Sequence, residues 1–143
     1  MLSNLLRSGT VAALLLTAGI ASAAEPATTN HYRAKQVLGT KIMLKGESTA
    51  AGTVDDLVFD DAGNLEYLIV DNGGKLVTVP FEAAVFNLEK KMATLTIAPE
   101  QYNLIPTYTT TTYPSFYAPA YRTETYKYYG VTPRELRVIS RRR

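Results

Sequence analysis

Short hydrophobic runs begin at residue 41 and are separated by Gly, Asp and Asn, which is typical of successive strands joined by tight turns. The run at 65–71 is apolar at both odd and even positions, so it predicts a strand buried on both faces near the centre of a sheet. The predicted strands are KIML (41–44), TVDDLVF (53–59), LEYLIVD (65–71), KLVTVPF (75–81) and MATLTIA (92–98).

The segments between these runs predict how the strands pair. Asn72 and Gly73 stand between two apolar runs, the strongest short-range signal of a β-hairpin, so 65–71 and 75–81 should be antiparallel. No long helical period interrupts the strands. The pattern therefore predicts an all-β domain of five to six short antiparallel strands, closed as a small barrel or tightly curled.

This region resembles the PRC-barrel domain over about residues 34–97. The resemblance implies a small β-barrel that acts as an adaptor, docking other proteins or assisting assembly, with no shared catalytic residues. The loop from Gly46 to Gly52 is longer than usual for the family, which affects the expected register of the first hairpin. The motif residues that carry the resemblance are Gly39, Gly52, Val54, Asp56, Phe59, Asp60, Gly63, Val79, Pro80 and Phe81.

The N-terminal residues have the pattern of a secretory signal peptide. Arg7 precedes an apolar run at 11–20, and small residues follow, so we expect a signal peptide at 1–23 with cleavage after Ala23. A retained membrane anchor is the alternative, although spanning takes about 20 apolar residues and this run is shorter. We therefore expect export to the periplasm or the medium, and a flexible lead at 24–33 before a barrel domain at 34–106. The chain has no cysteine, so its stability must come from packing.

Aspartates cluster at Asp55–Asp61, where a metal or acid/base site has to be weighed against a strand entering a turn. The spacing does not match a calcium loop, which leaves Asp60, Asp61 and Asn64 as weak candidate ligands. An acid/base pair would need a desolvated carboxyl, which a solvated turn does not provide. We favour the strand and turn, because Asp side chains commonly bond backbone amides there.

Other catalytic arrangements lack their residues. His31 is the only histidine and lies in the lead, and no cysteine is available as nucleophile or zinc ligand. No glycine-rich phosphate-binding motif occurs either. We expect a protein that is not an enzyme and that uses no cofactor.

Residues 107–131 are rich in Tyr, Thr and Pro and poor in aliphatic residues, which predicts a low-complexity tail that is disordered or extended. Tyrosines are also favoured at binding surfaces, so the tail could instead order on a partner or fold over its own barrel. The candidate interaction residues of this tail are Tyr113, Tyr117, Tyr121, Tyr126, Tyr128 and Tyr129.

Residues 132–143 form a basic end, although the whole chain is nearly balanced, with 15 Lys and Arg against 13 Asp and Glu. Thr132 as N-cap, Pro133 and Glu135 predict a short helix. Its cations suit an anionic polymer or membrane surface, whereas export argues against nucleic acid; a solvated basic terminus without a ligand is the simpler alternative. The candidate cations are Arg134, Arg137, Arg141, Arg142 and Arg143.

Together these features predict a non-enzymatic interaction or assembly module of the cell envelope, which binds envelope proteins that the sequence does not identify. The first alternative is a binder of polyanions or anionic membranes that acts through the basic C-terminus. The second is a weak metal-binding protein that uses the cluster Asp55–Asp61. Short, partly protected sheet edges also leave room for a homodimer.

Overall fold

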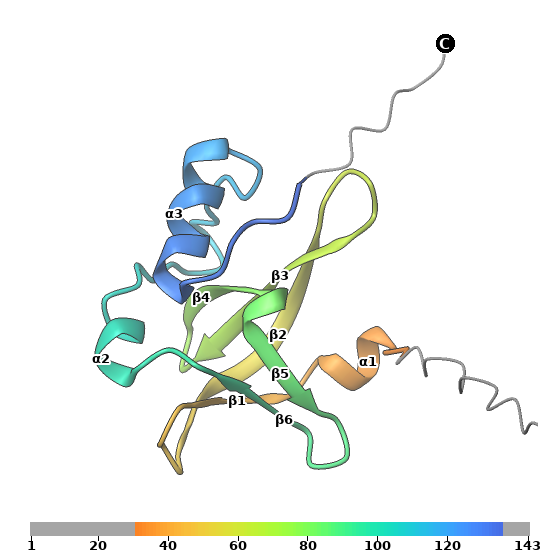
Figure 1. Cartoon of the computed structure of the whole chain (residues 1–143), viewed down its shortest axis with the longest axis vertical. Coiled ribbons are helices and arrows are strands. Elements are labelled where there is room, and N and C mark those ends of the chain that lie inside the picture. The colour runs from red at the N-terminus through yellow and green to blue at the C-terminus, as the bar shows by residue number, and fades with distance from the viewer. Residues whose placement is uncertain (1–30, 136–143) are drawn as a thin grey trace, which may run out of the picture. The chain divides into compact units, whose positions relative to one another are not determined.

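The computed structural model describes residues 31–135, and these form a six-stranded sheet with short helices around it (Figure 1). The predicted signal peptide, most of the lead, and Arg137 and Arg141–Arg143 lie outside the described residues. Between residues 31 and 135, no helix has both the length and the apolar character to cross a membrane. The strands are β1 Lys41–Leu44, β2 Ala50–Phe59, β3 Leu65–Asn72, β4 Lys75–Pro80, β5 Ala84–Asn87 and β6 Met92–Leu95, and the helices are α1 Ala34–Val37, the 3₁₀ turn η1 Phe81–Ala83, α2 Pro99–Tyr102 and α3 Pro119–Tyr129.

The strand order is β4-β3-β2-β1-β6-β5, and β3 is flanked on both sides as its apolar sequence predicted. The hairpin between β3 and β4 turns at Asn72 and pairs it with Lys75, which confirms the Asn-Gly signal. All neighbouring pairs are antiparallel except one: β1 and β6 run parallel, with Lys41 opposite Met92. The expectation of a wholly antiparallel sheet is therefore wrong. Four strands, β2 to β5, lie between β1 and β6 along the chain, and this long connection allows the chain to return in the same direction.

The sheet is not closed, because its two edge strands, β4 and β5, do not pair with each other. The expectation of a closed barrel is corrected to an open sheet. After β4 the chain turns through η1 and enters β5, which lies at the other edge of the sheet. Tyr102, Ile105 and Tyr129, which all follow the last strand, complete the hydrophobic core that the sheet alone leaves open.

The core lies on one face of the sheet. Val54 of β2, Leu68 and Val70 of β3, and Val77 and Val79 of β4 point into it and are almost fully buried. These residues follow the two-residue period of their strands. The opposite face of β3 and β4 carries Tyr67, Ile69 and Thr78, which are also buried. A second layer must therefore cover that face.

Gly52 of the family motif is required by a close approach between strands. A Cβ atom at this position would lie 2.6 Å from the backbone oxygen of Asp71 and 2.7 Å from a methyl group of Val70. The first hairpin also changes register between Ile42 and Met43, close to where β1 pairs with Gly52. Only a residue without a side chain fits where β2 crosses β3 this closely.

The aspartate-rich stretch is a strand running into a hairpin turn, as favoured from the sequence. β2 ends at Phe59, and the buried Asp60 caps the turn. Its Oδ1 accepts hydrogen bonds from the backbone N–H of Ala62 at 3.0 Å and of Asn64 at 2.8 Å, and the Asn64 amide donates to Oδ2 at 3.0 Å. Burial alone would raise the pKa of Asp60, but these hydrogen bonds and the positive charge of Arg134 outweigh it and lower the pKa.

Candidate functional site

The C-terminal segment forms the second layer of the domain. α3 begins with Pro119 at its first turn, ends at Gly130 in the left-handed conformation, and packs beside β4 (Figure 1). The prediction of an extended or disordered tail is wrong for 119–129. The alternative that the segment folds over its own barrel is the arrangement observed. Tyrosine supplies the hydrophobic area here that aliphatic residues supply in ordinary helices.

Aromatic rings hold this layer against the outer face of β3. Tyr67 lies with its ring centroid 6.1 Å from those of Phe116 and Tyr126 and 6.4 Å from that of Tyr121. Tyr126 is fully buried in this cluster. The segment is therefore a packed layer rather than an appendage.

An ion-pair network around the buried carboxylate of Glu66 fastens the same layer. The Nε of Arg122 lies 2.7 Å from Glu66 Oε1, which also accepts a hydrogen bond from the Tyr126 hydroxyl at 3.0 Å. The Nη2 of Arg134 donates to Glu66 Oε2 at 3.1 Å and to the Leu65 carbonyl oxygen at 2.8 Å. Two cations thus neutralise one carboxylate on β3, with hydrogen bonds to both of its oxygens.

This network changes the interpretation of the basic end. Arg134 was predicted to be a free cation for an anionic partner, but it binds Glu66 inside the domain. Residues 131–135 are not helical, so the helix expected to start at Thr132 does not begin there. Arg122 Nη2 donates at 2.6 Å to the Arg134 carbonyl oxygen and holds that backbone in place.

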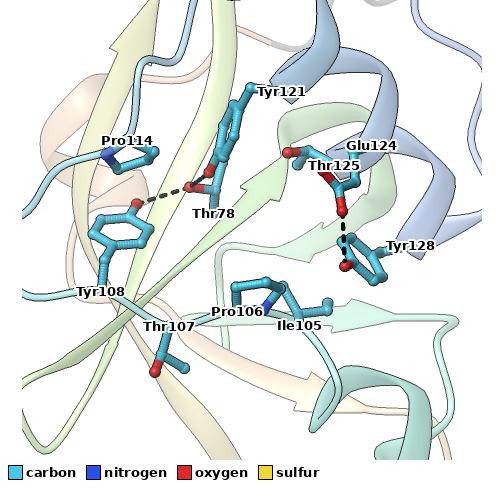
Figure 2. A pocket seen from close by; sticks show the side chains of 10 residues that line it. All are labelled: Thr78, Ile105, Pro106, Thr107, Tyr108, Pro114, Tyr121, Glu124, Thr125 and Tyr128. Carbon is cyan, nitrogen blue, oxygen red and sulfur yellow. Dashed lines mark hydrogen bonds between the residues drawn. The ribbon is translucent and has the colours of Figure 1, made fainter.

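A groove lies between α3 and the chain that follows α2 (Figure 2). It consists of two adjoining cavities of about 160 Å³ and 330 Å³, which share Glu124 and Tyr128. We call this groove the tyrosine groove. Its lining residues are Thr78, Gln101, Leu104, Ile105, Pro106, Thr107, Tyr108, Pro114, Tyr121, Glu124, Thr125, Lys127 and Tyr128.

Hydroxyl hydrogen bonds fix the rings of the groove. Figure 2 shows the hydroxyls of Tyr108 and Tyr121 converging on Thr78 from opposite sides. Tyr121 donates to Thr78 Oγ1 at 2.7 Å, and the same Oγ1 lies 2.7 Å from the Tyr108 hydroxyl oxygen. Tyr128 donates to Glu124 Oε1 at 3.2 Å. The rings are therefore positioned before any ligand arrives.

The predicted tyrosines divide into three groups. Tyr121 and Tyr128 line the groove, whereas Tyr126 and Tyr129 are buried inside the domain and cannot contact a partner. Tyr113 and Tyr117 are largely exposed beside the aromatic cluster, and Tyr117 donates to the Phe59 carbonyl oxygen.

The groove also contains residues that the sequence did not single out. Thr78 is the polar residue within the buried part of β4, Leu76–Pro80, and this interruption of an apolar run is the signal that the sequence offers. Glu124 is the acidic residue of the helix and lies at the rim. Leu104 is 74% exposed, which is unusual for a leucine beside a core, but its exposure has no signature in the sequence.

The weak metal candidates do not come together as a metal site. Asp60 uses its oxygens for the turn, and Asp61 is exposed. Within residues 31–135, no group of three or more His, Asp or Glu side chains could hold a metal ion. Asp60 caps the turn after β2 and has a structural role.

Comparison with known proteins identifies the family. The model of the PRC-barrel domain matches residues 29–102, which is more than half of the 143-residue chain. No curated protein matches the chain. The motif residues lie where a structural role expects them: Val54 is in the core, Gly39 has φ +78°, and Pro80 ends an edge strand. The chain belongs to the PRC-barrel family.

Proposed function

We propose that this protein is a non-enzymatic interaction or assembly module of the cell envelope. Membership of the PRC-barrel family is the observation that carries the proposal, because such domains suggest a role in protein interaction. The signal-like pattern at 1–23 supports an envelope location. The lack of cysteine and the single histidine of the sequence support a binding role rather than a catalytic one.

The exposed apolar side chains indicate where a partner would bind. Leu104 at the tyrosine groove and Val85 on the edge strand β5 are 74% and 68% exposed, respectively. Large apolar residues at the surface are favourable anchors once a partner removes them from water. The groove combines such a residue with rigid tyrosines, so it is the better docking surface of the two.

Site-specific photo-crosslinking in producing cells tests the proposal. A photoreactive residue would replace Leu104, Val85 or, as an exposed control, Lys90 in the β5–β6 turn. We expect a discrete adduct with another envelope protein from position 104 and none from position 90. A discrete adduct from position 85 alone would keep the interaction role but move it to the sheet edge. Absence of an adduct at 104 and 85 would contradict the proposed function.

A further inference from the structure

The contacts of the tyrosine groove indicate the kind of partner that it could bind, an inference that rests on the proposed function. Two features determine the class of ligand: the backbone groups that are available for hydrogen bonds, and the side chains that line the groove.

A partner strand cannot extend the sheet at this groove. The edge of β4 already pairs with Tyr108, since Leu76 N donates to Tyr108 O at 2.8 Å and Tyr108 N donates to Leu76 O at 3.0 Å. The next carbonyl along that edge, of Thr78, accepts the Tyr129 hydroxyl at 2.9 Å. With these backbone groups occupied, a ligand cannot gain affinity from ladder hydrogen bonds.

The groove instead offers rings and isolated polar atoms. Tyr108, Tyr121 and Tyr128 form its walls together with Pro106 and Pro114. Proline-containing segments in the polyproline II conformation suit such walls, because their stiff backbone needs no ladder and their rings pack on aromatic faces. Extended β peptides have neither advantage here.

The hydroxyl chain can supply one donor to a ligand. Tyr121 donates to Thr78 Oγ1, and either hydroxyl can be the donor between Thr78 and Tyr108. When Thr78 donates to the Tyr108 oxygen, the hydroxyl hydrogen of Tyr108 is available to a ligand. A polyproline II segment exposes its carbonyl oxygens, which are the matching acceptors.

The groove is lined by one carboxylate, that of Glu124, and by one cation, that of Lys127, and the carboxylate is the group that a ligand cation would meet. Glu124 is exposed, and its carboxylate accepts a hydrogen bond from Tyr128 but forms no ion pair with a cation of residues 31–135. It lies where the two cavities meet. A Lys or Arg of the ligand placed there would neutralise it.

We propose that the tyrosine groove binds a proline-containing segment of a partner protein in the polyproline II conformation, with a Lys or Arg of that segment beside Glu124. The segment packs its rings between the tyrosines and accepts a hydrogen bond from Tyr108. The proposed ligand class is therefore defined by a stiff, proline-containing backbone and by a positively charged side chain.

Fluorescence anisotropy with labelled peptides tests the proposal on the full-length chain. The probe is a short peptide with two proline pairs and an arginine at each end. The first control peptide has alanine at every proline, and the second has glutamate in place of arginine. We expect saturable binding of the probe, binding at least about tenfold weaker for the alanine peptide, and binding weaker than that of the probe for the glutamate peptide, which keeps the prolines but reverses the charge.

Variants locate the binding. Glu124→Gln should weaken the probe about two- to fivefold at low salt, as expected for one exposed ion pair, and Tyr128→Ala about tenfold or more. Tyr32→Ala and Glu89→Gln, both at exposed positions outside the groove, should leave the affinity unchanged. Melting curves show whether Tyr128→Ala is folded, and Glu124→Gln, at an exposed site, provides the test if it is not.

Three results would overturn the proposal. They are equal binding of the proline and alanine peptides, unchanged affinity in folded Glu124→Gln and Tyr128→Ala, and no saturation at millimolar peptide. Binding of a soluble glycan in place of the peptide would overturn it in favour of a carbohydrate site. If crosslinking from position 104 still captures a protein while every peptide fails, the interaction role stands and only the assigned ligand falls.

Discussion

The guanidinium of Arg122 on α3 lies 2.7 Å from the buried carboxylate of Glu66 on β3, and this contact joins two layers of the domain. The side chain of Glu66 is 4% exposed and that of Arg122 is 16% exposed. A pair this far from water needs good geometry to be favourable, and the additional bonds from Tyr126 and Arg134 provide it. The loss of either Glu66 or Arg122 should therefore lower the stability of the whole domain.

Replacing Glu66 with Gln should lower the free energy of unfolding by about 2–3 kcal/mol. The substitution leaves Arg122 without its counter-ion, and removing one partner of a buried pair is strongly destabilising, although the partial exposure of both arginines limits the loss. Urea unfolding followed by circular dichroism measures this. Glu89→Gln, at an exposed turn position, is the matched control and should change stability by less than about 0.5 kcal/mol. Equal midpoints for the two variants would show that the network adds nothing.

A chain truncated after Pro106 should lose its cooperative fold and aggregate. The cut removes Tyr121, Tyr126 and Tyr129 and exposes Tyr67 and Ile69 on the outer face of β3. We expect aggregation on size-exclusion chromatography and increased binding of a hydrophobic dye. A chain ending after Glu135 keeps these contacts and should elute as the full chain does. A stable, soluble monomer from the shorter chain would mean that the second layer is dispensable.

Substituting Gly52 by Ala should destabilise the domain by about 1–3 kcal/mol. The new methyl group would meet the Asp71 carbonyl oxygen at 2.6 Å, so β2 and β3 must separate. Gly63→Ala is the comparison: it has φ +79° but nothing within 4 Å, so it should cost only about 1 kcal/mol of backbone strain. Thermal melts rank the two variants. The reverse order would show that strand separation is easy and that turn strain dominates.

Alkaline pH should unfold the domain as its buried tyrosines ionise. Burial raises the pKa of Tyr102 from 10.0 to about 12, so folding favours its neutral form. That contribution is complete below pH 10 and is lost as the pH rises through 12. Tyrosinate absorbance and circular dichroism should change together over this window. In Tyr102→Phe the stability should fall less steeply with pH, and an identical slope would mean that Tyr102 does not contribute.

Local patterns predicted five of the six strands and the turns between them, but neither β5 at Ala84–Asn87 nor the pairing of β1 with β6. The Asn72–Gly73 hairpin and the Asp60 turn follow from rules that act over a few residues, and both are observed. The parallel pairing of β1 with β6 depends on the path of the intervening strands, which has no local signature.

Folding of the Tyr-rich segment over the barrel was one of the alternatives, but the helix α3 was not predicted, for a related reason. A helix is usually recognised from a periodic face of aliphatic residues. The buried residues of α3 are instead Thr125, Tyr126 and Tyr129, so the helix has no aliphatic face to recognise. Its partner Glu66 appeared to be a polar position on an apolar strand. Only the fold brings Glu66 within reach of Arg122 and Arg134, so neither the network nor the groove could be derived from the chain alone.

The parallel pairing of β1 with β6 also sets an order of events in folding. β2, β3 and β4 form consecutive hairpins, so their contacts close short loops, whereas Lys41 can meet Met92 only after roughly half of the domain has been traversed. Closing long loops costs more entropy and slows folding. The β2–β4 meander should therefore form first and β1–β6 last, and the amides at the β1–β6 junction should exchange with solvent before those of β3.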